Sequence, residues 1–240
     1  MIIFIQNISF KQYKYIDLSI LAVLIAISEA VTTVATNKWF VGVPFAISTT
    51  LLLTLVAMMR WSGYAAIIAA LGGVVFSIAS GADTSQYLIY TVGNLFSLLG
   101  LFVLLPVGKE RVRRSAPWTL LYCAVSYASL QLGRWLVSLI FELSIGSLLV
   151  FLTTDIITLL FSAVVLLLLR RVDGVFEDQK HYLLRLAEER EKGSSEDSGA
   201  GGAYYGEAFD GEEYDDLIED EYTDYDDEGE FVEKEPYIDD

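Results

Sequence analysis

Six apolar segments separated by short polar loops constrain this chain more than any other feature. They cover about residues 16–36, 40–59, 63–80, 87–107, 118–141 and 145–169. Each is close to the length of about 20 residues that a helix needs to cross a hydrocarbon layer about 30 Å thick. Inside such a layer the backbone amides and carbonyls must bond within the segment, so each segment should be a helix. The sequence therefore predicts an all-α, polytopic membrane protein with a bundle of six transmembrane helices.

The charges divide the chain at Gly193. The whole chain has a net charge of −16, yet residues 1–192 alone carry a net charge of +3, because residues 193–240 contain 20 Asp and Glu against one Lys. A segment with so much like charge cannot bury enough apolar surface to offset its chain entropy. We therefore predict a membrane domain over 1–172, a cytoplasmic amphipathic helix over 173–192 and a disordered acidic tail over 193–240.

The basic residues of the short loops predict the orientation. Loops on one side of the expected membrane hold nine of them, and the other side holds only Lys38. Positive charge marks the cytoplasmic side. The chain is therefore expected in the cell (plasma) membrane as a multi-pass protein with both termini in the cytoplasm. The nine residues are Lys11, Lys14, Arg60, Lys109, Arg111, Arg113, Arg114, Arg170 and Arg171.

The scarcity of cysteine and histidine excludes several classes of enzyme and metal protein. The chain has one of each, Cys123 and His181, so it can build neither an intramolecular disulfide nor a Cys/His metal cluster. A Ser-His-Asp triad would have to use His181, which lies in a charged segment. No P-loop motif is present either. We expect no enzyme activity, no cofactor, no metal and no nucleic-acid partner.

One arginine interrupts the fifth apolar segment, in "YASLQLGRWLVSLIFE". An arginine near the centre of a membrane helix costs about 2.5–3.5 kcal/mol on insertion scales, so Arg134 requires partners. At 1.5 Å per residue, Glu29, Asn94, Arg134 and Asp155 all lie roughly 10–15 Å below the expected outer surface. We therefore predict that Arg134 is offset by Glu29, by Asp155 or by both.

Further polar and aromatic side chains share this outer layer. Tyr127, Gln131 and Arg134 repeat at helical spacing, on one face of the fifth segment. Amide and aromatic groups beside charges suit a small organic solute. The candidate substrate-binding residues are Glu29, Tyr90, Asn94, Tyr127, Gln131, Arg134, Trp135 and Asp155. The alternative interpretation is that these polar groups serve only to pack the helices. A catalytic pair of Glu29 and Asp155 is not expected, because Arg134 beside them would keep both ionised.

Small residues repeat every four positions on the first segment, at Ala22, Ala26 and Ala30 in "LAVLIAISEA". This spacing lets another helix approach closely. Together with six apolar segments, both ends inside and a polar outer layer, it resembles the substrate-binding S component of energy-coupling factor transporters. The resemblance covers roughly residues 10–171.

That resemblance implies a function and a set of partners. The membrane subunit of such an importer captures a vitamin or similar micronutrient from outside, and then docks through its first helix to a transmembrane T subunit driven by two ATPase subunits. Ala22, Ala26 and Ala30 would be the docking residues. Nickel and cobalt are not expected solutes, because the metal-ion members use an N-terminal histidine and here "IIF" follows Met1. A different hypothesis is a membrane scaffold or regulatory protein that acts through its cytoplasmic acidic tail.

Overall fold

The computed structural model describes residues 10–39, 46–141, 146–183 and 185–186, and all the regular elements in these ranges are helices. The predicted acidic tail, 193–240, lies outside the described residues. Residues 15–191 form one unit of the chain. A second unit comprises 1–14 and 192–240, of which only 10–14, at the start of the first helix, are described.

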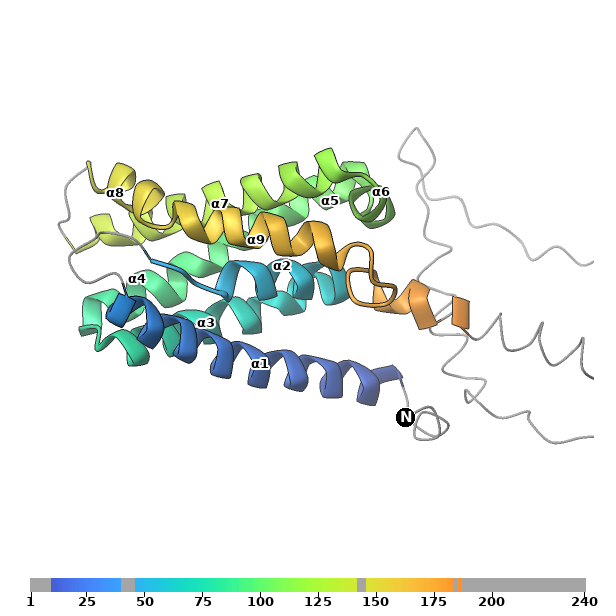
Figure 1. Ribbon diagram of the computed structural model, residues 1–240, viewed down its shortest axis with the longest axis horizontal. Helices are drawn as coiled ribbons and strands as arrows, with labels where there is room; N and C mark the ends of the chain where they lie inside the picture. The colour runs from blue at the N-terminus through green and yellow to red at the C-terminus, as the bar shows by residue number, and fades with distance from the viewer. Residues whose placement is uncertain (1–9, 40–45, 142–145, 184, 187–240) are drawn as a thin grey trace, which may run out of the picture. The chain divides into compact units, whose positions relative to one another are not determined.

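The helices run roughly along one common direction (Figure 1). In chain order the elements are α1 (Phe10–Trp39), α2 (Thr50–Trp61), η2 (Ser62–Tyr64), α3 (Ala65–Ser80), α4 (Thr84–Leu95), η3 (Phe96–Gly100), α5 (Leu101–Val107), α6 (Lys109–Arg114), α7 (Ala116–Leu139), α8 (Ser147–Thr154) and α9 (Ile156–Leu169).

Local sequence signals account for several helix ends. Gly81 ends α3 in the left-handed conformation, at φ 70°, which glycine adopts without steric cost. Asp83 then begins α4, because its side chain accepts a hydrogen bond from the backbone N–H of Gln86 at 2.9 Å. Pro117 stands in the first turn of α7, where its missing N–H is not needed.

Three helical stretches are long and apolar enough to cross a membrane. They are Phe10–Trp39, Thr50–Ser80 and Thr84–Val107, and α8 with α9 makes a fourth if this pair, bent by 41°, is counted as one span. The prediction of an all-helical protein with apolar helical stretches long enough to cross a membrane is confirmed at this level. The full count of six spans stays a prediction.

The stretch from Thr50 to Ser80 folds back on itself. Ser62 has a positive φ of 49°, and a Cβ added at Gly72 would lie 2.4 Å from the hydroxyl of Thr50. A straight helix would separate these two residues by about 33 Å. Residues 62–64 are therefore the turn between two helices, α2 and α3, that lie side by side.

Two predicted spans differ from what the structure shows. The second was expected over 40–59, but residues 46–49 are not helical and α2 begins only at Thr50. The sixth was expected over 145–169, and it is broken at Asp155 into α8 and α9. In both cases tertiary contacts of the backbone, described below, replace the helical hydrogen bonds.

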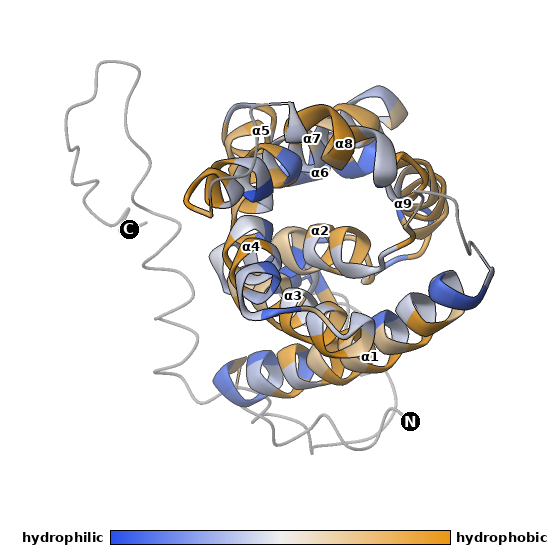
Figure 2. Cartoon of the chain, turned by 90° about the vertical axis from the view of Figure 1, so that its left-hand side faces the viewer, coloured by the Kyte–Doolittle hydropathy of each residue, from blue (hydrophilic) through white to orange (hydrophobic). Residues whose placement is uncertain are grey.

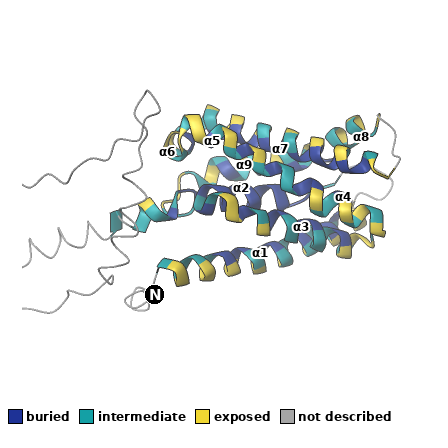
Figure 3. Cartoon of the chain, turned by 180° about the vertical axis from the view of Figure 1, so that it is seen from behind, coloured by how far each residue is buried: buried dark blue, intermediate teal, exposed yellow. Residues whose placement is uncertain are grey.

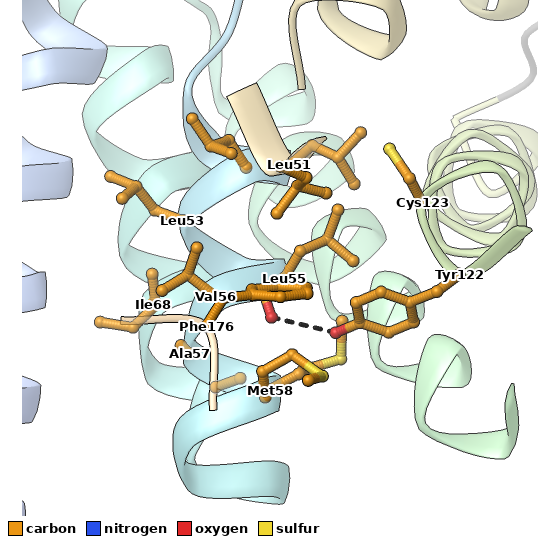
Figure 4. Close-up of a cluster of buried hydrophobic side chains, with 14 of the residues drawn as sticks. Leu51, Leu53, Leu55, Val56, Ala57, Met58, Ile68, Tyr122, Cys123 and Phe176 are labelled. Atoms are coloured by element: carbon orange, nitrogen blue, oxygen red, sulfur yellow. Dashed lines mark hydrogen bonds between the residues drawn. The ribbon is translucent and has the colours of Figure 1, made fainter. Parts of the chain in front are cut away.

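The core of unit 15–191 is built around α2. Figure 2 shows α2 enclosed by the other helices, and Figure 3 shows it as the most deeply buried of them. Leu55, Ala57, Met58 and Met59 on α2 are fully buried. The hydroxyl of Tyr122, on α7, donates to the carbonyl of Leu55 at 3.0 Å (Figure 4). Two neighbouring helices are thus tied through a buried polar atom.

The outward faces of the helices are apolar. On the outward face of α1, the large apolar side chains are 45–78% exposed, and α9 exposes a similar set. An exposed apolar face of this size is unusual for a protein surrounded by water and suits contact with lipid or with partner helices. The exposed side chains of α1 include Ile16, Ile20, Val23, Leu24, Ile27, Val31 and Val34.

The segment after α9 differs from the predicted helix over 173–192. Residues 171–177 form turns and bends, and helix begins at Gln179, within the described part of that range. Phe176 is fully buried in the core cluster that contains Leu55 and Met58 (Figure 4). Residues 173–177 do not form a helix, and this non-helical conformation lets the ring of Phe176 enter the bundle. Residues 187–192 of the predicted helix lie outside the described range.

Candidate functional site

Arg134 is buried in the bundle and has an acidic partner. It lies on α7 and is 4% exposed, and its guanidinium forms an ion pair with Asp155, which is 7% exposed. Its Nε donates to Oδ1 of Asn94, on α4, at 2.9 Å. The side-chain amide of Gln131 donates to Oδ2 of Asp155 at 3.1 Å. Of the two carboxylates expected to offset Arg134, the structure brings Asp155 to it.

An aromatic ring covers the guanidinium from α4. The centre of the Tyr90 ring lies 4.9 Å from the guanidinium carbon of Arg134, within the range of a cation–π contact. Phe76, on α3, packs against Tyr90 with ring centres 4.5 Å apart. We name the group formed by Tyr90, Asn94, Gln131, Arg134 and Asp155 the arginine layer.

Glycines let α4 and α7 approach closely enough to build the arginine layer. A Cβ added at Gly93 would lie 2.7 Å from the Cα of Arg134, and one added at Gly133 would lie 2.6 Å from the carbonyl oxygen of Gly93. Real side chains do not pack at such distances, so any larger residue would push the helices apart. Gly93 directly precedes Asn94, and Gly133 directly precedes Arg134. The close approach of the two helices at these glycines fixes the distance between Asn94 and Arg134.

Asp155 lies at the break between α8 and α9. The break is stabilised by residues 46–48, which run beside it in a non-helical conformation. The N–H of Ala46 donates to the carbonyl of Thr154 at 3.0 Å, and the N–H of Ser48 donates to the hydroxyl of Thr158 at 3.0 Å. Backbone groups outside helices are tolerated at membrane depth only where the protein or a polar cavity satisfies them.

Glu29 lies in a different environment from the one expected. Its Oε2 accepts hydrogen bonds from the N–H of Thr49 at 2.7 Å, the hydroxyl of Thr49 at 2.9 Å and the N–H of Thr50 at 3.0 Å. The expectation that Glu29 neutralises Arg134 is therefore replaced. The carboxylate binds the amides at the start of α2 instead, where the helix dipole favours negative charge.

The remaining candidate residues lie beside the arginine layer or away from it. The hydroxyl of Tyr127 donates to the carbonyl of Leu152, on α8, at 2.7 Å. Trp135 follows Arg134 on α7 and is partly exposed, and its carbonyl accepts from the hydroxyl of Ser138. Tyr127 thus ties α7 to α8 just before the break, whereas Trp135, four residues after Gln131 on α7, is only partly buried.

The role of residues 46–50 differs from the expected one. The second apolar segment, 40–59, includes "AISTT" in its predicted helix, although Ser and Thr before an apolar run favour a helix start. With that signal, α2 could have been predicted to begin near Thr50. The backbone contacts of Ala46 and Ser48 with α8 and α9 have no signal in the sequence.

The proposed docking alanines lie on α1. Ala22, Ala26 and Ala30 are all partly buried, and Ala22 packs against the core of the bundle. Part of this stripe is therefore used for packing within unit 15–191. The large exposed side chains of α1 lie on the neighbouring faces.

A second polar group, which we name the inner cluster, lies at the other end of α2. Arg60 binds both carboxylate oxygens of Asp17, at 2.6 and 2.8 Å, and donates to the carbonyl of Gly174 at 2.5 Å. Arg113 contacts Glu177 at 2.9 Å, and Lys109 forms an ion pair with Asp178. These contacts hold the segment that contains Phe176 against the ends of the helices.

Metal ligands and known relatives give no further guide to the site. Among the described residues, no group of three or more His, Cys, Asp or Glu side chains lies close enough to hold a metal ion. No protein-family model, curated protein or solved structure matches the chain.

Proposed function

We propose that the chain is the membrane-embedded solute-binding subunit of an energy-coupling factor importer. It would capture a small, vitamin-like micronutrient at the outer face and depend on a separate T subunit and two ATPase subunits for energy. In this proposal the six apolar segments are six spans, both termini are cytoplasmic, and the arginine layer lies below the outer surface of the cell membrane.

The arginine layer is the observation that carries the proposal. A buried ion pair is an inefficient way to stabilise a protein, because removing both charges from water costs about as much as their attraction returns. This pair is also surrounded by two amides and an aromatic ring, from Asn94, Gln131 and Tyr90. Such groups can recognise a small polar solute by hydrogen bonds and by stacking.

The break between α8 and α9 adds support to the proposal. Asp155 lies between α8 and α9, and the N–H of Ala46 bonds to the carbonyl next to it. Secondary transporters bind their substrates at discontinuous helices of this kind, near the middle of the membrane. A break whose backbone groups are already partnered can rearrange around a solute at a lower cost than a continuous helix.

Native mass spectrometry of the full chain tests the solute-binding proposal. We expect the protein purified gently in lipid nanodiscs to retain a small organic molecule. The double variant Arg134→Gln with Asp155→Asn removes one charge of each sign and keeps hydrogen-bonding groups, so it should fold and lose that molecule. The control Arg113→Gln changes an arginine of the inner cluster and should retain it. A folded double variant with the same bound mass would refute the proposal.

The partner part of the proposal has its own test. Changing Ala22 and Ala26 to Leu should abolish co-purification with a T subunit and its two ATPases, while the bound small molecule stays detectable. Loss of the bound molecule together with the partners would mean that these alanines serve only the internal packing of α1.

Membrane topology can be measured independently. A reporter fused after Lys192 should be found in the cytoplasm, and a reporter inserted at 81–86 should be found outside. An external reporter after Lys192 would place the arginine layer near the cytoplasmic surface and contradict capture from outside.

A scaffold or regulatory function is the second candidate. It is favoured by the inner cluster, which fastens the segment before the acidic tail to the bundle through Arg60, Lys109 and Arg113. Deleting residues 193–240 separates the two candidates. An importer subunit should keep its solute without the tail, whereas a scaffold should lose its partners.

A further inference from the structure

The two carboxylate oxygens of Glu29 have opposite environments. Oε2 accepts the three hydrogen bonds from Thr49 and Thr50 at the start of α2. Oε1 is buried and has no hydrogen-bond partner. The whole residue is 0% exposed. Half of this carboxylate is therefore fixed at a helix start, and the other half is enclosed without a donor.

The groups that surround Glu29 in the described part of the chain are neutral. Thr49 and Thr50 face it from the start of α2, where the hydroxyl of Ser48 accepts a hydrogen bond from the N–H of Thr50, and Thr33 follows it by one turn on α1. From α3, Gly72 lies against Thr50. The nearest titratable group towards α8 and α9 is Asp155, and Arg134 pairs with that carboxylate.

A buried carboxylate without a counter-ion is costly. In a low-dielectric interior such a group either pairs with a cation or becomes neutral by taking up a proton. Asp155 follows the first route through Arg134. Glu29 has three hydrogen-bond donors on one oxygen at the start of α2, and these favour its charged form. None of these donors carries a full positive charge, however, and the second oxygen makes no hydrogen bond.

We propose that Glu29 is a proton-binding site and that Oε1 carries the proton. A proton on Oε1 removes the charge from the bundle interior. It leaves Oε2 as the acceptor for the amides of Thr49 and Thr50, so the start of α2 stays bound in the neutral state. This site goes beyond the proposed capture of a solute and does not depend on it.

The buried face of α1 provides a polar path to this site. Thr33 and Thr36 follow Glu29 at i+4 and i+7 and are buried on the same face as Glu29. The hydroxyl of Thr33 has no hydrogen-bond partner. Hydroxyl groups both donate and accept, so they can relay a proton. The path leads from Glu29 towards the end of α1 at Trp39.

Loss of the proton would strengthen the hydrogen bonds between Glu29 and the start of α2. Hydrogen bonds to an ionised acceptor are about twice as strong as those between neutral groups. These hydrogen bonds come from Thr49 and Thr50, which directly follow the segment that contacts the break at Asp155. Proton occupancy is thereby linked to how firmly residues 46–50 are held. Only a resulting effect on solute affinity rests on the proposed function.

Infrared difference spectroscopy of the full chain in lipid nanodiscs tests the proton site directly and needs no solute. We expect a carbonyl stretch of a protonated, weakly hydrogen-bonded carboxylic acid that appears and disappears during a pH titration. Carbon-13 labelling of glutamate should shift this band. Glu29→Gln should remove it, and the control Glu110→Gln, which changes a glutamate of α6 that is paired with Arg114, should leave it unchanged.

A second variant covers the case in which Glu29→Gln does not fold. In glutamate-labelled Glu29→Asp, the band should persist but lose its isotope shift, because the acid at this position is no longer a labelled glutamate. The proposal is overturned if no such band titrates in the parent. It is also overturned if the band keeps its isotope shift in Glu29→Asp, or is unchanged in folded Glu29→Gln.

Discussion

The arginine layer and the inner cluster use the same chemistry in two different settings. Both pair an arginine with a carboxylate. In the arginine layer, the side chains of Arg134 and Asp155 are 5% and 10% exposed, and their other partners are neutral amides. In the inner cluster, the ion-paired side chains range from 6% exposed for Glu177 to 22% for Lys109. The inner-cluster contacts are three ion pairs that attach a chain segment to the bundle, whereas the single pair of Arg134 and Asp155 lies at a break in a helix.

This difference suggests different roles. The inner cluster spreads its charges over three ion pairs, which together hold one chain segment around the buried ring of Phe176. A deeply buried pair returns little net stability but is costly to break. The arginine layer is therefore poorly explained as a device for stability. A role in binding accounts better for its amides and its aromatic ring.

The largest expected effect is that of Arg134→Ala. Removing the guanidinium leaves Asp155 buried without a cation, and breaking a buried pair costs about 3–5 kcal/mol of unfolding free energy. The measurement is equilibrium unfolding of the purified protein in mixed micelles. A loss below about 1 kcal/mol would show that the pair behaves as a solvent-exposed surface pair.

The matched control for Arg134→Ala is the double variant Arg134→Gln with Asp155→Asn. It removes both charges, so the cost of the unpaired carboxylate disappears and most of the lost stability should return. Recovery identifies the unpaired charge as the cause of the large effect. If the double variant is as unstable as Arg134→Ala, packing around the side chain is the cause instead.

Phe176→Ala should have the next largest effect. The ring is fully buried among Leu55, Val56 and Met58 (Figure 4), and removing a buried phenylalanine costs about 3–5 kcal/mol. The loss should appear locally, because the ring belongs to the segment after α9. We expect faster hydrogen exchange of residues 173–183 with little change in α7, as measured by mass spectrometry. Equal acceleration in both regions would mean that the inner cluster supports the whole bundle.

The sequence predicted the parts of the molecule that depend on local pattern. Apolar length located the helix of the fifth apolar segment to within a few residues: it was expected over 118–141 and is observed as α7, Ala116–Leu139. The cost of an unpaired charge in lipid indicated that Arg134 needs an acid, and helical depth included Asp155 among the candidates. Both inferences require only the rise per residue along a helix and the cost of an unpaired charge in lipid.

The parts that could not be predicted depend on contacts between distant segments. The break at Asp155 requires Ala46 and Ser48 as partners, more than 100 residues earlier in the chain. Glu29 pairs with amides of Thr49 and Thr50, and backbone amides leave no trace in a sequence pattern. Phe176 lies within the range predicted as an amphipathic helix, 173–192, because the sequence does not show that its ring packs into the core of the bundle.

Gly93→Ala should have a moderate effect on the arginine layer. An added Cβ would lie 2.7 Å from the backbone of Arg134, so α4 and α7 must separate. Overpacking of this kind costs about 1–3 kcal/mol of unfolding free energy. The control is Gly63→Ala, where nothing lies within 4 Å of an added Cβ. Equal stability of the two variants would show that the approach of the helices is adjustable, and that Asn94 is not held at a fixed distance from Arg134.

The smallest expected effect is on the pH dependence of protein stability, through Glu110 on α6. Burial alone would raise the pKa of Glu110, but hydrogen bonds from Arg114 and Arg113 outweigh it and hold this pKa below its ordinary value of 4.5. A carboxyl whose pKa is lower in the folded state adds stability above the unfolded value, and this contribution is lost as the pH falls through the folded pKa. Glu110→Gln should therefore be less stable than the parent above pH 4.5, by less than about 1 kcal/mol because the group is half exposed. The two proteins should become equal at lower pH.

The control is Arg111→Gln, an exposed neighbour on α6, which should leave the pH dependence unchanged. A parent and a Glu110→Gln variant that differ by the same amount at every pH would show that Arg113 and Arg114 do not hold this carboxylate in its ionised form, and that Arg113 acts in the inner cluster through Glu177 instead.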